Sequence, residues 1–215
     1  MDGAPLLTEA DGRLYTRNAY PGTRVYGERL RTFGGIEYRE WTPYRSKLSA
    51  YLMSGGKSVP FRQDSNVLYL GAASGTTASH VSDLVPDGKV YCLEFSPRTF
   101  RDLVGVCGRR GNMIPILGDA TQPDSYRFAV GSVDIVYQDV AQKRQPDIFA
   151  ANMDAFGAKA GMLCIKSRSE DVTAEPRKIF SDSEASLKKH GFRIIDSVEL
   201  ERYEKDHIMI VAERA

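Results

Sequence analysis

Short apolar runs and longer amphipathic segments alternate along the chain from residue 66 onward. The runs at 67–70, 90–95, 114–117, 133–137 and 162–166 are apolar throughout, as are strands buried on both faces of a parallel sheet. Helices fit between them at 77–85, 97–109, 146–156 and 176–190, and three of these begin with proline, which a first helical turn tolerates. This alternation predicts an α/β fold with a doubly wound, mostly parallel sheet and right-handed crossovers.

The last two apolar runs, at 193–200 and 207–211, are separated only by a short polar link. With no helix between them, we expect an antiparallel C-terminal hairpin at one edge of the sheet. This ending is usual in Rossmann-like class I methyltransferases and unusual in nicotinamide-binding domains. We therefore predict a class I methyltransferase domain over residues 57–215.

The chain before residue 57 has a different pattern. Residues 13–47 contain eight lysines and arginines, three acids and seven aromatic residues. Turn signals at 20–22 and 34–35 divide this segment into short pieces that predict β-hairpins, and a short helix is expected from Pro43. We predict a small, β-rich N-terminal domain over residues 1–56.

Composition narrows the class of protein only slightly. The chain has 215 residues, 42% of them hydrophobic and 27% charged, with a net charge of +1. These values are ordinary for a soluble protein and argue against a polybasic nucleic-acid binder, although a local basic face is compatible with them. We expect no membrane span and no secretory signal. The three cysteines and three histidines have no metal-ligand spacing, so no metal site is predicted.

A glycine turn follows the first strand of the predicted sheet, in the sequence VLYLGAASGTT at 67–77. Its spacing, with glycine at positions 71 and 75, differs from the Gly-x-Gly-x-x-Gly turn that binds a pyrophosphate. Glu94 ends the next strand, where a carboxylate can accept hydrogen bonds from both ribose hydroxyls. The turn, with Gly71 and Ala72, therefore predicts a site for a nucleoside without phosphates, of which S-adenosyl-L-methionine is the common one. A glycine turn that serves only packing is the alternative.

Polar or aromatic residues follow each of the other parallel strands, at the edge where such sheets bind ligands. We expect Asp119 to accept a hydrogen bond from an adenine amino group and the ring of Phe95 to stack on the adenine. Main-chain groups would close the pocket; they belong to Ala120, Asp139, Val140, Ala141 and Gln142. Each acid taken singly can also be a helix cap or a solvated loop residue.

Asp139 and Lys166 follow neighbouring strands, so their side chains are expected to approach each other. Burial lowers the pKa of a lysine, and a carboxylate can orient the amine. Such a pair can hold an alcohol and help to deprotonate it. A purely structural ion pair is the alternative interpretation.

Several segments, taken together, resemble the fibrillarin family, particularly its archaeal form. They are WTPYRSKLSAYL at 41–52, VLYLGAASGTTASHVSDLV at 67–85, VYCLEFSPR at 90–98, ILGDA at 116–120, DVAQ at 139–142, CIKS at 164–167 and YEKDH at 203–207. The resemblance implies an S-adenosylmethionine-dependent RNA 2′-O-methyltransferase that works in a box C/D guide ribonucleoprotein. It also implies three kinds of partner: a guide RNA that pairs with ribosomal or transfer RNA, a scaffold protein of the Nop family, and a kink-turn-binding protein of ribosomal type.

The resemblance further implies roles for individual residues. The positions that match cofactor contacts in the family are Thr76, Thr77, Glu94, Phe95, Asp119, Ala120 and Asp139 to Gln142. The catalytic tetrad of related 2′-O-methyltransferases matches Lys47, Asp139, Lys166 and His207. The chain lacks the Gly/Arg-rich N-terminal region of eukaryotic fibrillarins, so the resemblance implies an archaeal protein that acts in the cytoplasm.

Two other functions fit the same sequence. A class I methyltransferase with a small-molecule substrate would have the same sheet and cofactor pocket, and a non-catalytic assembly subunit would keep only the fold. The aromatic and basic N-terminal segment favours an RNA enzyme with an open basic face. That segment can contact RNA directly or dock the scaffold protein, and the sequence does not choose between the two.

Overall fold

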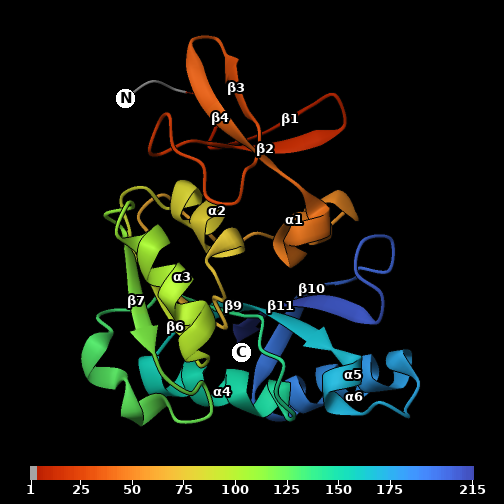
Figure 1. Ribbon diagram of the computed structural model, residues 1–215. Coiled ribbons are helices and arrows are strands. Elements are labelled where there is room, and N and C mark those ends of the chain that lie inside the picture. The colour runs from red at the N-terminus through yellow and green to blue at the C-terminus, as the bar shows by residue number, and fades with distance from the viewer. Residues whose placement is uncertain (1–3) are drawn as a thin grey trace.

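Four strands near the N-terminus pair into a small antiparallel sheet above a larger, mostly parallel one (Figure 1). The structure is a computed structural model that describes residues 4–215. The small sheet has the order β1-β2-β4-β3 and consists of β1 (Leu7–Ala10), β2 (Arg13–Arg17), β3 (Leu30–Phe33) and β4 (Ile36–Trp41).

The predicted turn at 34–35 joins β3 to β4, and both of its glycines have positive φ. The predicted turn at 20–22 is not a hairpin turn, because it lies in the long connection between β2 and β3. The other hairpin, between β1 and β2, turns instead at Asp11 and Gly12, which also have positive φ. An aspartate–glycine pair suits such a turn, so the sequence did contain a signal for it.

The larger sheet has seven strands in the order β10-β11-β9-β8-β5-β6-β7. They are β5 (Val67–Leu70), β6 (Val90–Glu94), β7 (Met113–Leu117), β8 (Ile135–Gln138), β9 (Ala160–Lys166), β10 (Phe192–Glu199) and β11 (His207–Arg214). The first five are parallel, and β11 runs antiparallel to both of its neighbours, β9 and β10. The predicted fold class, including the antiparallel hairpin at one edge, is therefore confirmed.

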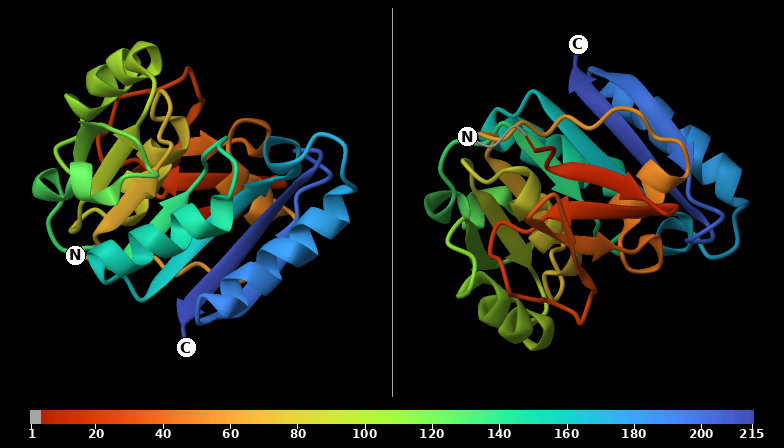
Figure 2. Two further views of the ribbon diagram at one scale, coloured as in Figure 1. Left: turned by 90° about the horizontal axis from the view of Figure 1, so that it is seen from below. Right: turned by 90° about the horizontal axis from the view of Figure 1, so that it is seen from above.

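Helices cover both faces of this sheet. One face packs against α1 (Lys47–Met53), α2 (Thr76–Leu84) and α3 (Pro97–Cys107), through buried residues such as Leu48, Val81 and Leu103. The other packs against α4 (Gln145–Phe156) and α6 (Pro176–Lys189), and α6 lies beside β11 in the view from below (Figure 2). Short helices complete the chain: η1 (Pro43–Arg45), η2 (Pro123–Ser125), η3 (Arg127–Ala129) and α5 (Ser167–Glu170). Of these, η2, η3 and α5 were not predicted.

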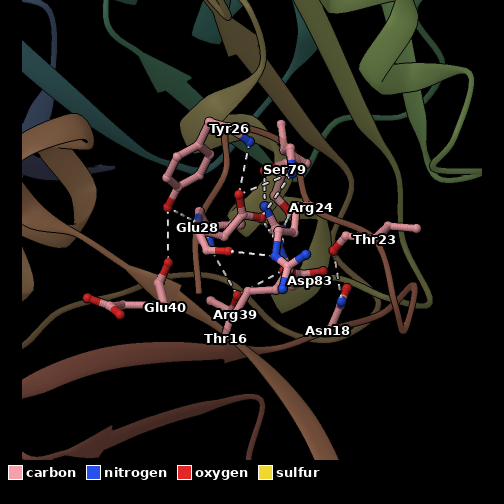
Figure 3. A network of polar contacts seen from close by, with 12 residues as sticks. Thr16, Asn18, Thr23, Arg24, Tyr26, Glu28, Arg39, Glu40, Ser79 and Asp83 are labelled. Carbon is pink, nitrogen blue, oxygen red and sulfur yellow. Dashed lines mark hydrogen bonds and ion pairs between the residues drawn. The ribbon is translucent and has the colours of Figure 1, made fainter. Parts of the chain in front are cut away.

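A buried polar network joins the small sheet to α2 (Figure 3). Arg39 of β4 is fully buried and donates from Nε to Glu28 at 2.6 Å, and from Nη1 to Asp83 of α2 at 2.7 Å. Asp83 also accepts from Thr16 of β2 at 2.8 Å and pairs with Arg110. Buried charges require partners of this kind, so the network fixes how the small sheet sits on α2.

Apolar contacts extend the same interface. Leu14 of β2 and Trp41 of β4 belong to the core that covers the α1–α3 face of the larger sheet. In the view from above, the strands of the small sheet lie across the larger part of the molecule (Figure 2). The predicted division after residue 56 stays a prediction. Within residues 4–215, no helix is long and apolar enough to cross a membrane.

Candidate functional site

A cavity of about 410 Å³ opens at the carboxyl ends of the parallel strands. This is the place where open α/β sheets bind ligands, and the volume lies within the usual range for small-molecule sites. Its lining comes from the turns after β5, β6, β7, β8 and β9: Gly71, Ala73, Leu93, Glu94, Phe95, Gly118, Ala120, Asp139, Val140, Ala141, Gln142 and Lys166.

The glycine turn after β5 approaches the turn after β8 closely. Gly71 has a φ of +81°, and a Cβ atom built there would lie 2.6 Å from the carbonyl oxygen of Asp139. Glycine is therefore required at this position for both its conformation and its size. Gly75 has a φ of +90° and precedes the first residue of α2. Of this turn, Gly71 and Ala73 line the cavity.

Glu94 is fixed at the rim of the cavity by main-chain donors. Its carboxylate accepts from the N–H groups of Ala73 at 2.9 Å and Ser96 at 2.8 Å, and from the hydroxyl of Thr99 at 2.9 Å. Each carboxylate oxygen has lone pairs left for a ligand. The ring of Phe95 is 68% exposed beside it, as a stacking platform for an aromatic ligand would be.

Asp119, in the turn after β7, contacts Gln142, which lines the cavity from the turn after β8. The amide of Gln142 donates to Asp119 Oδ1 at 3.0 Å, and the N–H of Thr121 donates to the same oxygen at 2.9 Å. Burial alone would raise the pKa of Asp119, but these hydrogen bonds outweigh it and hold the pKa below its usual value. Asp119 is therefore an ionised acceptor at neutral pH.

Three charged side chains meet where the cavity adjoins α1. Lys166 Nζ lies 2.7 Å from Asp139 Oδ1, and Lys47 Nζ lies 3.9 Å from Oδ2 of the same carboxylate. Lys47 also lies 3.8 Å from Glu204, in the link before β11. Burial acts to lower the pKa of Lys47, but the two carboxylates outweigh it and raise that pKa. Lys47 is therefore cationic at neutral pH.

His207, the first residue of β11, is the cross-strand partner of Lys166. Directly paired residues project from the same face of a sheet, so the imidazole and the ammonium group share one side. His207 Nδ1 lies 2.5 Å from the carbonyl oxygen of Lys205, which can only accept a hydrogen bond. Nδ1 therefore carries a proton. When the ring is neutral, Nε2 carries none and can accept a hydrogen bond.

Six of the predicted site residues are not among those that line the cavity: Lys47, Ala72, Thr76, Thr77, Asp119 and His207. Ala72 and Thr77 are buried, and Thr77 donates instead to Ser46, the residue that caps α1 just before Lys47. Thr76 begins α2. Their contact with a cofactor stays a prediction. Within the described part of the chain, no group of three or more His, Cys, Asp or Glu side chains is placed to hold a metal ion.

The structure also adds residues that sequence reasoning missed. Ala73, Leu93 and Gly118 line the cavity, and Glu204 contacts Lys47. Leu93 precedes Glu94 at the end of β6, so its position at a strand end was the available signal. Glu204 lies within the YEKDH segment at 203–207, but nothing in its spacing connects it to a residue so distant in sequence.

The strand order, the single antiparallel strand and the glycine turn facing an acid at the end of β6 define a class I methyltransferase. Comparison with known proteins gives the family. The sequence model of the family described as Fibrillarin matches residues 5–215, which is nearly the whole chain. The chain belongs to the fibrillarin family.

Individual relatives are similar over almost their full length. A fibrillarin-like rRNA/tRNA 2′-O-methyltransferase of Methanothermobacter thermautotrophicus is 51% identical over 216 residues, which cover 100% of this chain and 95% of the relative. The structure of Aeropyrum pernix fibrillarin with natively bound S-adenosyl-L-methionine has 46% identity and a TM-score of 0.85, covering 93% and 88% of the two chains. The fibrillarin of a fibrillarin/Nop5p complex has 40% identity and a TM-score of 0.89, with 98% of each chain covered.

Proposed function

We propose that this chain is an S-adenosyl-L-methionine-dependent RNA 2′-O-methyltransferase that modifies ribosomal and transfer RNA. The observation that carries the proposal is the Lys47–Asp139–Lys166 cluster at the mouth of the cavity. An assembly subunit without activity would have no use for two lysines around one carboxylate next to a nucleoside-sized cavity. The relatives named for this reaction, at about half identity over the full chain, support it.

The cavity fits the proposed cofactor. Gly71 and Ala73 of the glycine turn line the cavity with little or no side chain, so the backbone there can approach a ligand closely. Glu94 has acceptor capacity for ribose hydroxyls, Asp119 is an ionised acceptor for an amino group, and Phe95 presents a ring face. When bound, S-adenosyl-L-methionine supplies an electrophilic methyl group on a sulfonium. The structure of Aeropyrum pernix fibrillarin with this molecule bound supports the assignment.

The charged cluster then acts on the ribose hydroxyl. Asp139 holds Lys166 through the contact of 2.7 Å, and its charge helps to raise the pKa of Lys47. Lys166 donates a hydrogen bond to the 2′-oxygen and stabilises the negative charge that develops as the hydroxyl passes its proton to the Asp139 carboxylate. Lys47 anchors the nucleotide on the α1 side, and His207 completes the network with the free Nε2. Holding the hydroxyl in line for attack supplies much of the acceleration.

Partners select the target nucleotide. We propose that the chain acts in a box C/D guide ribonucleoprotein with a guide RNA, a Nop-family scaffold protein and a kink-turn-binding protein, in the cytoplasm. The solved fibrillarin/Nop5p complex of a similar chain supports the scaffold partner. With a net charge of +1, the isolated chain is expected to bind RNA weakly and to gain affinity from these partners.

The test is methylation in a particle reconstituted with guide RNA and partner proteins, with cofactor binding measured separately by calorimetry. We expect Lys166→Ala and Asp139→Ala to reduce turnover at least about hundredfold, because each removes a group that positions or activates the hydroxyl. Cofactor affinity should survive better in Lys166→Ala, since Asp139 then still pairs with Lys47, whereas Asp139→Ala leaves both lysines without that carboxylate at the cavity.

Lys178→Ala is the matched control. Lys178 lies 2.7 Å from Asp182, the same distance as in the proposed catalytic pair, but both are exposed on α6. The Lys178→Ala variant should methylate RNA with the turnover of the wild type. Near-normal turnover in Lys166→Ala would remove the catalytic assignment, and no cofactor binding by the wild type would favour an assembly subunit.

A further inference from the structure

We propose that Gln145 is a positioning residue for the proposed reaction, because its side-chain amide fixes the main chain of Lys166. Gln145 begins α4, is fully buried and stands 21 positions before Lys166 in the chain. It is not among the residues that line the cavity, so it acts through Lys166 and not on a ligand. This inference rests on the proposed function, since it concerns the lysine that contacts the ribose hydroxyl in that proposal.

The main chain of Lys166 has no neighbouring strand on one side. Strand β8 ends at Gln138, whose partner in β9 is Leu163, three residues before Lys166. On the other side, the N–H of Ser167 donates to the carbonyl oxygen of Asp206 at 3.1 Å, in the link before β11. The N–H and C=O of Lys166 therefore lie beyond the last pair of the β8–β9 ladder. A main-chain group shielded from water costs free energy when it has no partner.

The amide of Gln145 takes the place of the missing strand. Its Oε1 accepts a hydrogen bond from the N–H of Lys166 at 2.9 Å, and its Nε2 donates to the carbonyl oxygen of Lys166 at 3.2 Å. A primary amide has a carbonyl acceptor and two N–H donors, so one side chain satisfies both main-chain groups. Lys166 is therefore held as if β8 continued beside it.

The segment that carries this amide is itself held by neighbouring side chains. The carbonyl oxygen of Gln145 accepts a hydrogen bond from Nε2 of the fully buried Gln138 at 2.9 Å. The carboxylate of Glu170 accepts from the N–H groups of Gln145 at 2.6 Å and Arg144 at 2.8 Å. Arg144 has a φ of +60°, a conformation that residues other than glycine rarely adopt and that persists where the surroundings fix it. The main chain of Gln145 is thus fixed on both sides, and its amide is directed at Lys166.

The main-chain position of Lys166 determines where its ammonium group lies. Nζ donates to the carbonyl oxygen of Asp139 at 3.2 Å and lies 2.7 Å from Oδ1 of the same residue. An ammonium group has three N–H donors, so one is left for the 2′-oxygen. A displacement of about 1 Å at a reacting group can lower a rate about hundredfold. We therefore expect Gln145 to affect the rate of methyl transfer more than the binding of the cofactor.

The experiment compares two variants that each remove a buried amide with the same pair of main-chain contacts. Gln145→Met removes both hydrogen bonds to Lys166 and keeps the length of the side chain. Asn18→Leu is the matched control, because Asn18, between β2 and β3, accepts from the N–H of Tyr20 at 3.1 Å and donates to the carbonyl oxygen of Thr23 at 3.2 Å. In the reconstituted particle we expect Gln145→Met to lower kcat about tenfold, with KM for RNA and the calorimetric Kd of the cofactor within about twofold of the wild type. Asn18→Leu should leave kcat unchanged.

A double-mutant cycle with Lys166→Ala separates positioning from a general loss of structure. If Gln145 acts through Lys166, adding Gln145→Met to Lys166→Ala should lower turnover by less than about twofold. An equal loss in both backgrounds would overturn the proposal, and so would a normal kcat in the single variant Gln145→Met.

Hydrogen exchange of the Lys166 amide, followed by NMR, tests the same contact without turnover. In Gln145→Met this N–H has lost its acceptor, so it should exchange at least about tenfold faster than in the wild type, and Asn18→Leu should not change it. Unchanged exchange in Gln145→Met would show that Gln145 does not hold Lys166. An inactive wild-type particle would contradict the proposed function instead, because the exchange rate still reports whether Gln145 holds Lys166.

A second variant keeps the test decisive if Gln145→Met does not fold. Glu170→Ala removes the carboxylate that holds the N–H of Gln145 and changes a residue that is only half-buried. We expect it to lower kcat about threefold and to speed exchange at the Lys166 amide, because Gln145 then moves more freely. Wild-type values for both quantities would contradict the positioning role.

Discussion

Gly71 lines the cofactor cavity and also lies against the backbone of Asp139, a member of the charged cluster. Replacing it with alanine forces a Cβ atom to within 2.6 Å of the Asp139 carbonyl oxygen, in a backbone with a φ of +81°. We expect Gly71→Ala to weaken cofactor binding at least about tenfold and to reduce methylation with it, because the turn and Asp139 must move apart. Calorimetric titration with the cofactor measures the first effect.

Gly157→Ala separates the clash from backbone strain. Gly157 ends α4 with a φ of +67°, but no atom lies within 4 Å of a Cβ atom built there. Both substitutions carry the conformational penalty of about 1–2 kcal/mol, and only the one at Gly71 carries the clash. If both variants bound the cofactor equally well, the close approach at Gly71 would have no functional role.

At the residue scale, the sequence predicted positions at strand ends and missed contacts between distant segments. Glu94 and Asp139 follow apolar strands, so the rule for parallel sheets placed them at one edge correctly. Thr77 looked equivalent in sequence, but helix geometry turns its hydroxyl toward Ser46. The raised pKa of Lys47 depends on Glu204, and no local pattern predicts that contact.

At the element scale, α2 connects the cofactor turn to the small sheet. Removing the Arg39 side-chain charge leaves Glu28 buried without its cation and Asp83 without one of its two. We expect Arg39→Met, which keeps the apolar stem, to lower the free energy of unfolding by about 3–5 kcal/mol. Urea denaturation followed by circular dichroism measures the change.

Arg177→Ala serves as the comparison, since it breaks the exposed pair with Glu199. An exposed ion pair contributes little, so its free energy of unfolding should stay within about 1 kcal/mol of the wild type. Equal stability of the two variants would mean that the buried network does not hold the small sheet in place.

His80, also on α2, makes stability depend on pH. Its ring stacks on Trp41 with centroids 4.8 Å apart, and Thr16 and Tyr26 lie within hydrogen-bonding distance of its nitrogens. Burial first, and then the charges of Arg39 and Arg110, hold its pKa well below the ordinary 6.5. As the pH falls below about 6.5, the unfolded chain therefore takes up a proton that the folded protein refuses, and stability is lost.

The expected contribution of His80 is about 1.4 kcal/mol per pH unit below pH 6.5. Urea titrations between pH 7.5 and 5, read against His80→Gln, isolate it, because the variant has no proton to take up at this position. The free energy of unfolding of the wild type should fall more steeply as the pH is lowered, by the slope that corresponds to the uptake of one extra proton on unfolding. Parallel curves for the two proteins would show that His80 titrates alike in the folded and unfolded states.

Elements differ in how far the sequence predicts them. The strands and long helices of the larger sheet were predicted to within a few residues, because buried parallel strands are apolar throughout. The helix α5, of four residues, is too short for a periodic pattern to develop. The β1–β2 turn was not predicted, although an aspartate–glycine pair such as Asp11 and Gly12 is typical of a tight hairpin turn.

At the scale of the whole molecule, the sequence predicted the larger sheet but not where the small sheet packs against the rest of the protein. A doubly wound, mostly parallel sheet follows from the alternation and crossover rules, although its strand order was not predicted. The placement of the small sheet depends on pairs such as Thr16 with Asp83, 67 positions apart in the chain. Within residues 13–47, Arg39 is buried in the interface with α2, whereas Arg24 and Arg29 are exposed. A role of this segment in RNA contact or in scaffold docking stays a prediction.

The two ends of α2 have one further consequence. The helix follows the glycine turn whose Gly71 and Ala73 line the cavity, and Asp83 near its last turn is held by the small sheet. A ligand that binds only the folded protein stabilises whatever unfolds with its site. Occupancy of the cavity is thus expected to stabilise the packing of the small sheet on α2. By the same linkage, a change that loosens this packing, such as loss of Arg39, is expected to weaken ligand binding in the cavity.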